Sequence, residues 1–323
     1  MIAAEGVRAA AAVLLGDIVE WSPVRGGGNN QLFRARTATG TTSAVKAYPQ
    51  TAGDQRDRYA VESAALAFVN RVAPGTSPQV LACDDDARIV AAEWIDGGAI
   101  DAAEASIAQV LAFLAALHAA RTASGAERFG PASEACFSVV DLREQLAARR
   151  ARLAEVPDLA GLLERFDALA EQALAASDSE VALDPGLRTL SPSDFGFHNA
   201  LLRDERIVFF DFEYFGWDDP VKTVADFVWH PAMSLDQAAR GQFLAGAAVL
   251  YGADGGYAAR LRARLPLYGL RWALIVLNEF LPERWARRVA AGLTEDRDAI
   301  LERQRAKAHG FLEKVDQLLG EGR

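Results

Sequence analysis

The pattern of the chain changes from strand-like to helical about a third of the way along, and this change limits the possible folds. Short β-branched runs broken by turns fill residues 24–90, and they include two strands, 32–37 and 43–48, joined by Ala-Thr-Gly-Thr-Thr. A helix is predicted over 56–72 and a buried strand over 87–95. The first third therefore predicts a small mixed domain built on a sheet.

The rest of the chain is mostly helical. Apolar residues recur at helical spacing between 107 and 117, and a second long helix is predicted over 139–177. Helices resume over 221–251, 257–291 and 295–319. The exception is 181–215, where two apolar runs separated by Arg203-Asp204-Glu205 predict a strand pair. The predicted fold class is α+β, with a small sheet-containing part and a large helical part that carries one hairpin.

Composition fits a folded protein with two domains or one two-lobed unit. The chain has 323 residues, of which 51% are apolar and 24% charged, near the globular averages of about 45–50% and 25%. Cys83 and Cys136 lack the spacing of a metal site or a disulfide framework, which favours a cytoplasmic location. The N-terminus lacks a basic leader, and apolar runs such as 273–277 are shorter than the roughly 18 residues of a membrane span, so no membrane partner is expected.

The net charge is −10, which argues against a nucleic-acid partner, because nucleic-acid binders carry a basic surface for phosphates. Residues 1–92 carry nine basic and nine acidic side chains, so the remainder holds the whole deficit. This acidic part either attracts a cationic substrate or carries ordinary solubility charge. The same two interpretations, acceptor contact or a solvated face, apply to four acidic residues: Asp218, Asp219, Glu279 and Glu283.

The strongest candidate site consists of Asp194, Asn199 and Asp211. An Asp and an Asn five residues apart, with a second Asp twelve residues later after a hairpin, would supply one carboxylate near a nucleophile and two oxygen ligands for magnesium. The spacing matches the catalytic-loop pattern H-R-D-x-x-x-x-N and the metal-binding Asp of the kinase fold. Taken alone, the spacing D-x-x-x-x-N would occur by chance in many proteins.

Other parts of the same pattern lie upstream in the expected order. The loop Arg-Gly-Gly-Gly-Asn-Asn at 25–30 precedes a strand, Lys46 lies in Ala-Val-Lys-Ala-Tyr, and Glu62 follows on the next predicted helix. Each of these has an ordinary explanation by itself: a hairpin turn, an edge-strand lysine and a solvated helix glutamate. Their order along the chain makes the combination specific.

With these residues in place, the sequence resembles the aminoglycoside phosphotransferase and choline kinase family, small-molecule relatives of the protein kinases. The resemblance is most specific over 194–226, where D-F-G-F-H-N, D-F-E and D-D-P-V-K-T-V-A-D-F follow the family order. It implies a bilobal protein-kinase-like fold with a nucleotide-binding lobe over 1–92, a hinge over 93–98 and a helical lobe over 99–323. The helical lobe would carry the catalytic loop and the substrate cleft.

The resemblance also implies roles for individual residues. Asp194 would be the catalytic base that orients the acceptor hydroxyl and takes its proton, while Asn199 and Asp211 would hold Mg2+. Glu213 would assist the metal or the substrate, or else be a surface carboxylate. The remaining residues would bind ATP: Lys46 with its partner Glu62 at the phosphates, Gly27, Gly28 and Asn30 as the flap above them, Glu93, Trp94 and Ile95 as the hinge beside adenine, and Leu201 as the floor under the base. GTP stays open as the donor.

The implied function is transfer of the γ-phosphoryl group of ATP to a hydroxyl of a small molecule such as an aminoglycoside, an amino alcohol or a sugar. One departure from the family is Pro192, which stands where the family has a His two residues before the catalytic Asp. It motivates the alternative of an inactive nucleotide-binding pseudokinase with a regulatory role, and a helical scaffold is a second alternative. His198 is interpreted as a packing or loop hydrogen-bonding residue. The sequence leaves the acceptor and the oligomeric state unidentified.

Overall fold

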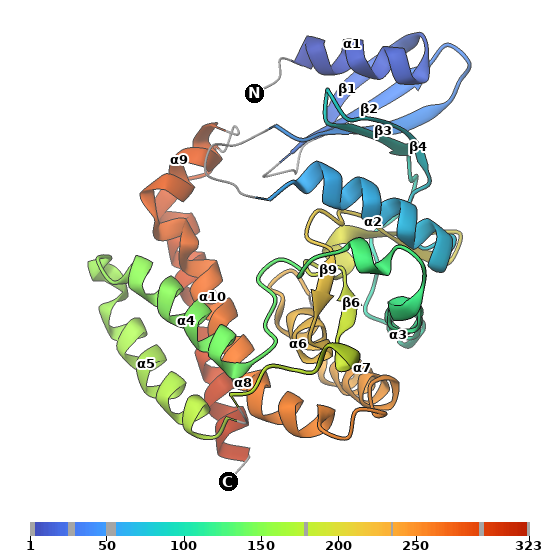
Figure 1. The fold of residues 1–323 in the computed structure, drawn as a ribbon. Helices are drawn as coiled ribbons and strands as arrows, with labels where there is room; N and C mark the ends of the chain where they lie inside the picture. The colour runs from blue at the N-terminus through green and yellow to red at the C-terminus, as the bar shows by residue number, and fades with distance from the viewer. Residues whose placement is uncertain are drawn as a thin grey trace. The chain divides into compact units, whose positions relative to one another are not determined.

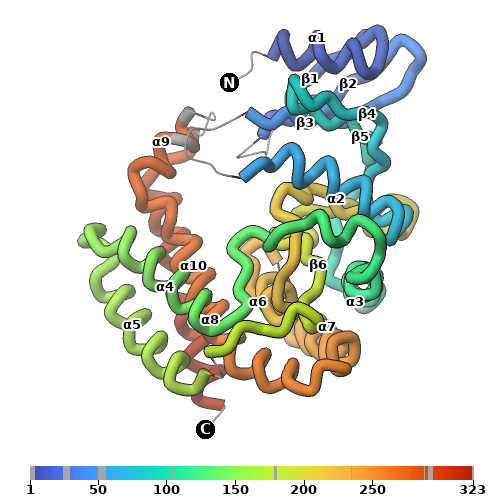
Figure 2. Tube along the Cα trace, viewed as in Figure 1, coloured from blue at the N-terminus to red at the C-terminus, as the bar shows by residue number. Residues whose placement is uncertain are grey.

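The computed structural model describes residues 4–24, 30–49, 56–177, 180–233, 235–290 and 294–321. The chain divides into two compact units (Figures 1 and 2). Unit 1 comprises 1–133 with 190–216, and unit 2 comprises 134–189 with 217–323. The predicted lobe boundary at residue 92 and the predicted hinge at 93–98 stay predictions.

Unit 1 contains a five-stranded antiparallel sheet with the strand order β1-β2-β3-β5-β4. Its strands are β1 (Ile18–Val24), β2 (Gln31–Thr37), β3 (Thr42–Ala47), β4 (Val80–Asp84) and β5 (Ile89–Glu93). The predicted hairpin is confirmed as β2 and β3, with Phe33 opposite Val45 and Leu32 opposite Lys46. The predicted strand at 87–95 is confirmed as β5, and the fold class is α+β.

The two faces of this sheet carry different helices. The helix α1 (Ala4–Leu15), which the sequence reasoning missed, packs Val7 and Ala11 against alternate sheet residues, among them Val45 and Ala47. Because successive side chains of a strand point to opposite faces, Lys46 lies on the other face, where α2 (Arg58–Val72) runs (Figure 1). The Lys46 side chain therefore points from the sheet toward α2.

The helix α3 (Glu104–Ala119) packs an apolar stripe into unit 1. By length and composition alone, the segment Ala105–Thr122 could cross a membrane, so the expectation that no segment is long and apolar enough was wrong. Part of this apolar surface is buried in unit 1: Phe113 is 2% exposed and stacks on Phe209 with 4.5 Å between ring centroids. Its ring also lies 5.7 Å from that of Phe195, so α3 supports the segment that carries the candidate site.

The predicted strand pair near residue 200 is confirmed. It consists of β7 (Ala200–Arg203) and β8 (Arg206–Phe209), and a short helical turn (Phe197–Asn199) precedes it. Asp204 and Glu205 form the tip and have φ angles of 49° and 63°, the left-handed values that a two-residue hairpin turn requires. Two further strands, β6 (Thr189–Ser191) and β9 (Gly216–Asp218), contain points where the chain passes from one unit to the other.

Unit 2 is helical. Its elements are α4 (Val139–Leu153), α5 (Ala160–Ala175), α6 (Pro220–Trp229), α7 (Gln237–Leu250), α8 (Tyr257–Val276), α9 (Pro282–Ala290) and α10 (Arg297–Glu321). Three predicted helices are each interrupted, at Pro157, Pro231 and Pro282. Proline lacks the backbone N–H that an α-helix interior uses and is tolerated best in a first turn; Pro266, in contrast, lies inside α8. The helix α8 is central and contacts α4, α5, α6 and α10.

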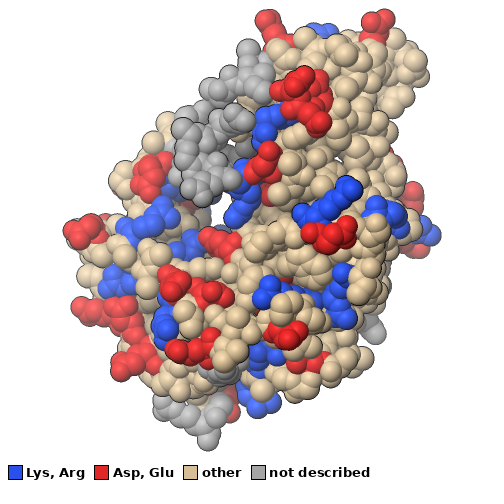
Figure 3. Space-filling model, viewed as in Figure 1, with Lys and Arg blue, Asp and Glu red and all other residues tan. Residues whose placement is uncertain are grey.

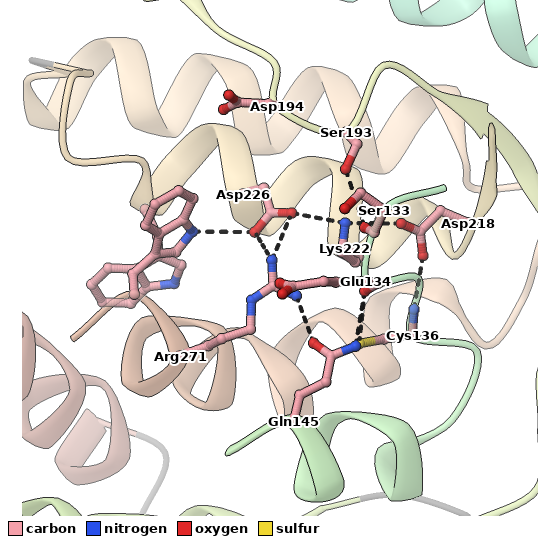
Figure 4. Close-up of polar contacts among 12 residues, drawn as sticks. Ser133, Glu134, Cys136, Gln145, Ser193, Asp194, Asp218, Lys222, Asp226 and Arg271 are labelled. Atoms are coloured by element: carbon pink, nitrogen blue, oxygen red, sulfur yellow. Dashed lines mark hydrogen bonds and ion pairs between the residues drawn. The ribbon is translucent and has the colours of Figure 1, made fainter. Parts of the chain in front are cut away.

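Charged side chains fill part of the interior of unit 2. Lys222 of α6 is fully buried, and its Nζ lies 2.9 Å from Asp218 and 3.0 Å from Asp226. Figure 4 shows Lys222 between these two carboxylates. Asp226 also accepts hydrogen bonds from Arg271 at 3.0 Å and from Trp272 Nε1 at 3.1 Å. Two carboxylates and two cations therefore compensate one another without solvent.

Both interpretations of Asp218 and Asp219 from sequence were wrong, because neither carboxylate is exposed. Asp219 caps α6 through the N–H of Val221 and pairs with Arg260 and Arg264. These acids stabilise the interior and face neither solvent nor an acceptor. On the face drawn in Figure 3, acidic and basic side chains are intermixed.

Candidate active site

The predicted catalytic residue Asp194 lies in unit 1, in the loop between β6 and β7. Its side chain is 38% exposed, and its Oδ1 lies 3.1 Å from His198 Nε2. The Asn199 side chain donates from Nδ2 to the backbone oxygen of Asp194 at 3.0 Å. The interpretation of His198 as a loop hydrogen-bonding residue is consistent with this geometry, but the sequence reasoning missed that its partner is the Asp194 carboxylate, although the i, i+4 spacing offered a signal.

The loop around Pro192 is held by serine and asparagine hydrogen bonds. The backbone N–H of Ser193 donates to Ser191 Oγ at 3.1 Å, and Ser193 Oγ donates to the backbone oxygen of Ser133 at 3.2 Å. These bonds brace the backbone next to Asp194.

Two residues of the site have strained backbones. Ser193 has a φ of 66° and Asp211 a φ of 68°, values that cost a non-glycine residue roughly 1–2 kcal/mol. Strain of this kind persists where the surroundings fix it, and it concentrates at functional positions. Ser193 directly precedes the candidate base, and Asp211 is a candidate metal ligand.

The hairpin β7–β8 brings Asn199 and Asp211 together at its base. Ala200 pairs with Phe209, and the N–H of Phe210 donates to the backbone oxygen of Asn199 at 3.0 Å. The hydrogen bond from Asn199 to Asp194 uses the amide nitrogen, so it does not consume the amide oxygen, which is the atom that binds hard cations. An amide oxygen and a carboxylate thus fit a magnesium ion with its remaining positions filled by water and phosphate.

Lys46 lies between two carboxylates of unit 1. Its Nζ is 2.6 Å from Glu62 Oε2 and 2.5 Å from Asp211 Oδ1, and the Tyr48 ring centroid lies 5.4 Å from it. Burial alone would lower the pKa of Lys46, but the two carboxylates outweigh burial and raise its pKa above the usual range. Lys46 is therefore a fixed positive charge beside the candidate metal ligand, and the predicted pair with Glu62 is present.

Glu213 has a different environment from the one expected. It is 2% exposed, so the interpretation as a surface carboxylate was wrong. Its Oε1 lies 2.5 Å from Arg58 Nη1, and its Oε2 accepts a hydrogen bond from Asn30 Nδ2 at 3.1 Å. Arg58 is the first residue of α2 and also donates to Tyr214 Oη at 2.7 Å. Sequence reasoning missed Arg58, because no motif marks an arginine at the start of this helix.

The predicted hinge packs closely against β7. Gly98 and Leu202 exchange two backbone hydrogen bonds of 2.9 Å, and a Cβ on Gly97 would lie 2.8 Å from the Leu202 carbonyl oxygen and 3.0 Å from Leu201 Cβ. The Leu201 side chain thus lies beside the hinge backbone, where a base would need an apolar floor.

The three hinge residues named from the sequence have different surroundings. Glu93 pairs with Arg203 of β7 and accepts a hydrogen bond from the N–H of Gln79. The Trp94 ring lies under the Arg34 guanidinium at 5.2 Å, and Ile95 is buried. Gly27 and Gly28, predicted to cover the phosphates, lie outside the described residues.

Comparisons with known proteins bear on this site. The model of the phosphotransferase enzyme family matches residues 20–265. A choline/ethanolamine kinase family protein from Mesorhizobium loti superposes with a TM-score of 0.63 at 19% identity, over 98% of this chain and 97% of that one. A macrolide 2'-phosphotransferase from Brachybacterium faecium has a TM-score of 0.60 at 21% identity, over 89% and 98%.

An amicoumacin kinase, solved with AMP-PNP and Ca2+, has a TM-score of 0.57 at 16% identity, over 97% of this chain and 94% of its own. No curated protein matches the chain in sequence. At these identities the solved structures show the fold alone, and that fold is kinase-like, as predicted.

Proposed function

The chain belongs to the phosphotransferase enzyme family and is a small-molecule kinase, and from this premise we propose that it transfers the γ-phosphoryl group of ATP to a hydroxyl of a small molecule. The arrangement of Lys46, Glu62 and Asp211 carries the proposal: one lysine within 2.6 Å of a helix glutamate and 2.5 Å of the candidate metal ligand. An enzyme that transfers phosphoryl groups needs little more than positioning and charge neutralisation. This cluster can supply both.

In the proposed reaction, Asp194 orients the acceptor. Its half-exposed carboxylate accepts the hydroxyl proton as the acceptor oxygen bonds to the γ-phosphorus, and the bond from that phosphorus to the bridging oxygen breaks with its electron pair leaving on ADP. His198 and the brace at Ser193 fix the carboxylate and its backbone. Holding the acceptor in this position converts a bimolecular encounter into a local step.

On the nucleotide side, Lys46 would bind the phosphates while Glu62 holds it in place. Asn199 and Asp211 would hold Mg2+, which neutralises phosphate charge when bound. Asn30, with Gly27 and Gly28, would cover the phosphates. The base would lie between the hinge backbone of Glu93, Trp94 and Ile95 and the side chain of Leu201. GTP remains a possible donor to be compared directly with ATP.

The acceptor is proposed to be a hydroxyl-bearing small molecule, with cationic compounds first among the candidates because the chain carries a net charge of −10. We expect no nucleic-acid or membrane partner and a cytoplasmic location. Similar structures include proteins named for choline or ethanolamine and for macrolides, so both amino alcohols and macrolides belong in the panel.

Thermal melts with ATP, with and without Mg2+, test the nucleotide site. Ligand at 100 times its Kd should add about 2.7 kcal/mol of stability. Asp211→Asn should lose the magnesium-dependent part of this gain. A matched control is Asp204→Asn at the exposed hairpin tip, which should keep it. No gain in the wild type would contradict the proposed function.

Turnover tests the base. ADP release is measured over a panel of amines, amino alcohols, aminoglycosides, macrolides and neutral sugars. Asp194→Asn should keep the thermal gain with ATP and Mg2+ and lose turnover, because it removes the proton acceptor while leaving the nucleotide contacts. Turnover at the wild-type rate in Asp194→Asn would contradict the assignment of the base.

A further inference from the structure

Glu213 joins three segments that are far apart in the sequence. Its Oε1 binds Arg58 at the start of α2, its Oε2 binds Asn30 just before β2, and its own backbone follows Asp211 by two residues. Both carboxylate oxygens thus have donors at 2.5 and 3.1 Å. Glu62, Asp211 and Glu213 each offer a carboxylate oxygen within 4.8 Å of the other two. A metal on Glu213 would share its oxygens with these donors and would lie beside the positive Arg58 guanidinium.

The helix α2 contacts the segment 211–213 a second time, one turn further along the helix. Arg58 and Glu62 are four residues apart, so they lie on one face of α2. Arg58 pairs with Glu213 directly, and Glu62 reaches Asp211 through Lys46. The opposite charges of Arg58 and Glu62 fix the position of α2 along the segment 211–213. A shift by one helical turn would place the Glu62 carboxylate opposite the Glu213 carboxylate, and the two would repel.

The ion pair between Arg58 and Glu213 is largely buried, so its strength depends on how well the two groups are aligned. Glu213 is 2% exposed and the Arg58 side chain 19% exposed, so solvent and salt screen the pair little. Charge-assisted hydrogen bonds of this length are strong and directional. A carboxylate held on both oxygens fixes the backbone that carries Asp211, whose φ of 68° needs such support.

We propose that Glu213 is a positioning residue, through which Arg58 and Asn30 hold Asp211 where magnesium binds. This inference rests on the proposed function and deepens it. Residues that orient metal ligands typically change metal affinity or activity by about 10–100-fold when replaced. Arg58 is a cation and cannot ligate a metal, so a loss of magnesium-dependent binding in its variant reports on the positioning of Glu213.

A double-mutant cycle tests the proposal. Calorimetric titration measures the Kd for ATP, with and without Mg2+, in the wild type, Arg58→Gln, Glu213→Gln and the double variant. Each single variant should bind ATP about 10–100-fold more weakly with Mg2+ and change less without it. The double variant should be no weaker than the weaker single variant, because both changes break one unit.

Arg88→Gln is the matched control. Arg88 pairs with Asp57, the N-cap of α2, at 2.7 Å on an exposed side of the helix start. This variant should bind ATP and Mg2+ as the wild type does. An equal loss in Arg88→Gln would assign the effect to general helix stability and overturn the proposal.

The outcomes separate the alternatives. A loss in Glu213→Gln with wild-type binding in Arg58→Gln would make Glu213 a metal ligand and overturn the proposal, as would wild-type binding in both. If Arg58→Gln fails to fold, Arg58→Lys replaces it. It should still bind ATP with Mg2+ more weakly than the wild type, because an ammonium cannot hold Glu213 and Tyr214 as the planar guanidinium does. Wild-type binding in Arg58→Lys would then overturn the proposal. If the wild type itself shows no magnesium-dependent binding, the proposed function fails as well.

Discussion

Replacing Lys222 by Met should destabilise the protein more at pH 8 than at pH 5. The variant keeps the volume of the side chain and removes the cation between Asp218 and Asp226. Removing one partner of a buried ion pair typically costs about 3–5 kcal/mol. The lower end applies here, because Asp218 keeps two backbone N–H donors and Asp226 keeps Arg271.

The pH dependence follows from Asp218. Burial raises its pKa in the folded protein even with Lys222 present, and loss of the cation raises it further. A carboxyl with a raised folded pKa gains stability as the pH falls through that pKa, since the neutral form needs no counterion. The cost of Lys222→Met should therefore be about 3 kcal/mol at pH 8 and at least about 1 kcal/mol smaller at pH 5.

Urea unfolding followed by circular dichroism at both pH values measures this difference. The variant Lys222→Met/Asp218→Asn should recover part of the loss at pH 8, because it removes one of the two buried charges. A cost that is equal at pH 5 and pH 8 would refute the reasoning, because lost packing does not titrate. A cost under about 1 kcal/mol at pH 8 would also refute it.

Two other predictions concern unit 1. Gly216→Ala should lower the free energy of unfolding by about 1–3 kcal/mol, because its Cβ would lie 2.5 Å from the Gly130 carbonyl oxygen. The control Gly241→Ala, in open space on α7, should raise it by about 0.5–1 kcal/mol. Urea unfolding measures both, and an unchanged free energy of unfolding in Gly216→Ala would contradict the contact. Burial lowers the pKa of His118 to about 4, helped by a neighbouring arginine, so the unfolded chain takes up a proton between pH 6.5 and 4 while the folded protein does not. As the pH falls from 6.5 to 4, the free energy of unfolding of the wild type should therefore fall more steeply than that of His118→Gln. Urea midpoints that change in parallel for the two proteins would contradict this prediction.

The sequence predicted the elements that carry the site, because their signals are local. The alternation in β2 and β3, the turn between them, and the spacing of Asp194, Asn199 and Asp211 all lie within short stretches. The pair of Lys46 with Glu62 followed from the order of the motifs and is present at 2.6 Å. Their roles in catalysis stay predictions.

What the sequence could not predict depends on contacts between distant residues. Asp218 and Asp219 look like surface charges in a polar string, and only tertiary structure places cations from α6 and α8 beside them. Arg58 meets Glu213 across 155 positions of sequence, and no local pattern records such a pairing. The prediction of one helix over 139–177 was wrong for a different reason. The apolar residues recur at helical spacing on both sides of Pro157, but the helical backbone is interrupted there.

The hairpin β7–β8 also separates two engineering tasks within one short segment. Asn199 and Asp211 lie at its base, where a backbone hydrogen bond joins the two strands, while Asp204 and Glu205 form an exposed tip. Exposed tips tolerate insertions and new chain termini best. The tip is therefore the place to graft a fluorescent reporter or to open a circular permutant, since both candidate ligands would stay joined at the opposite end.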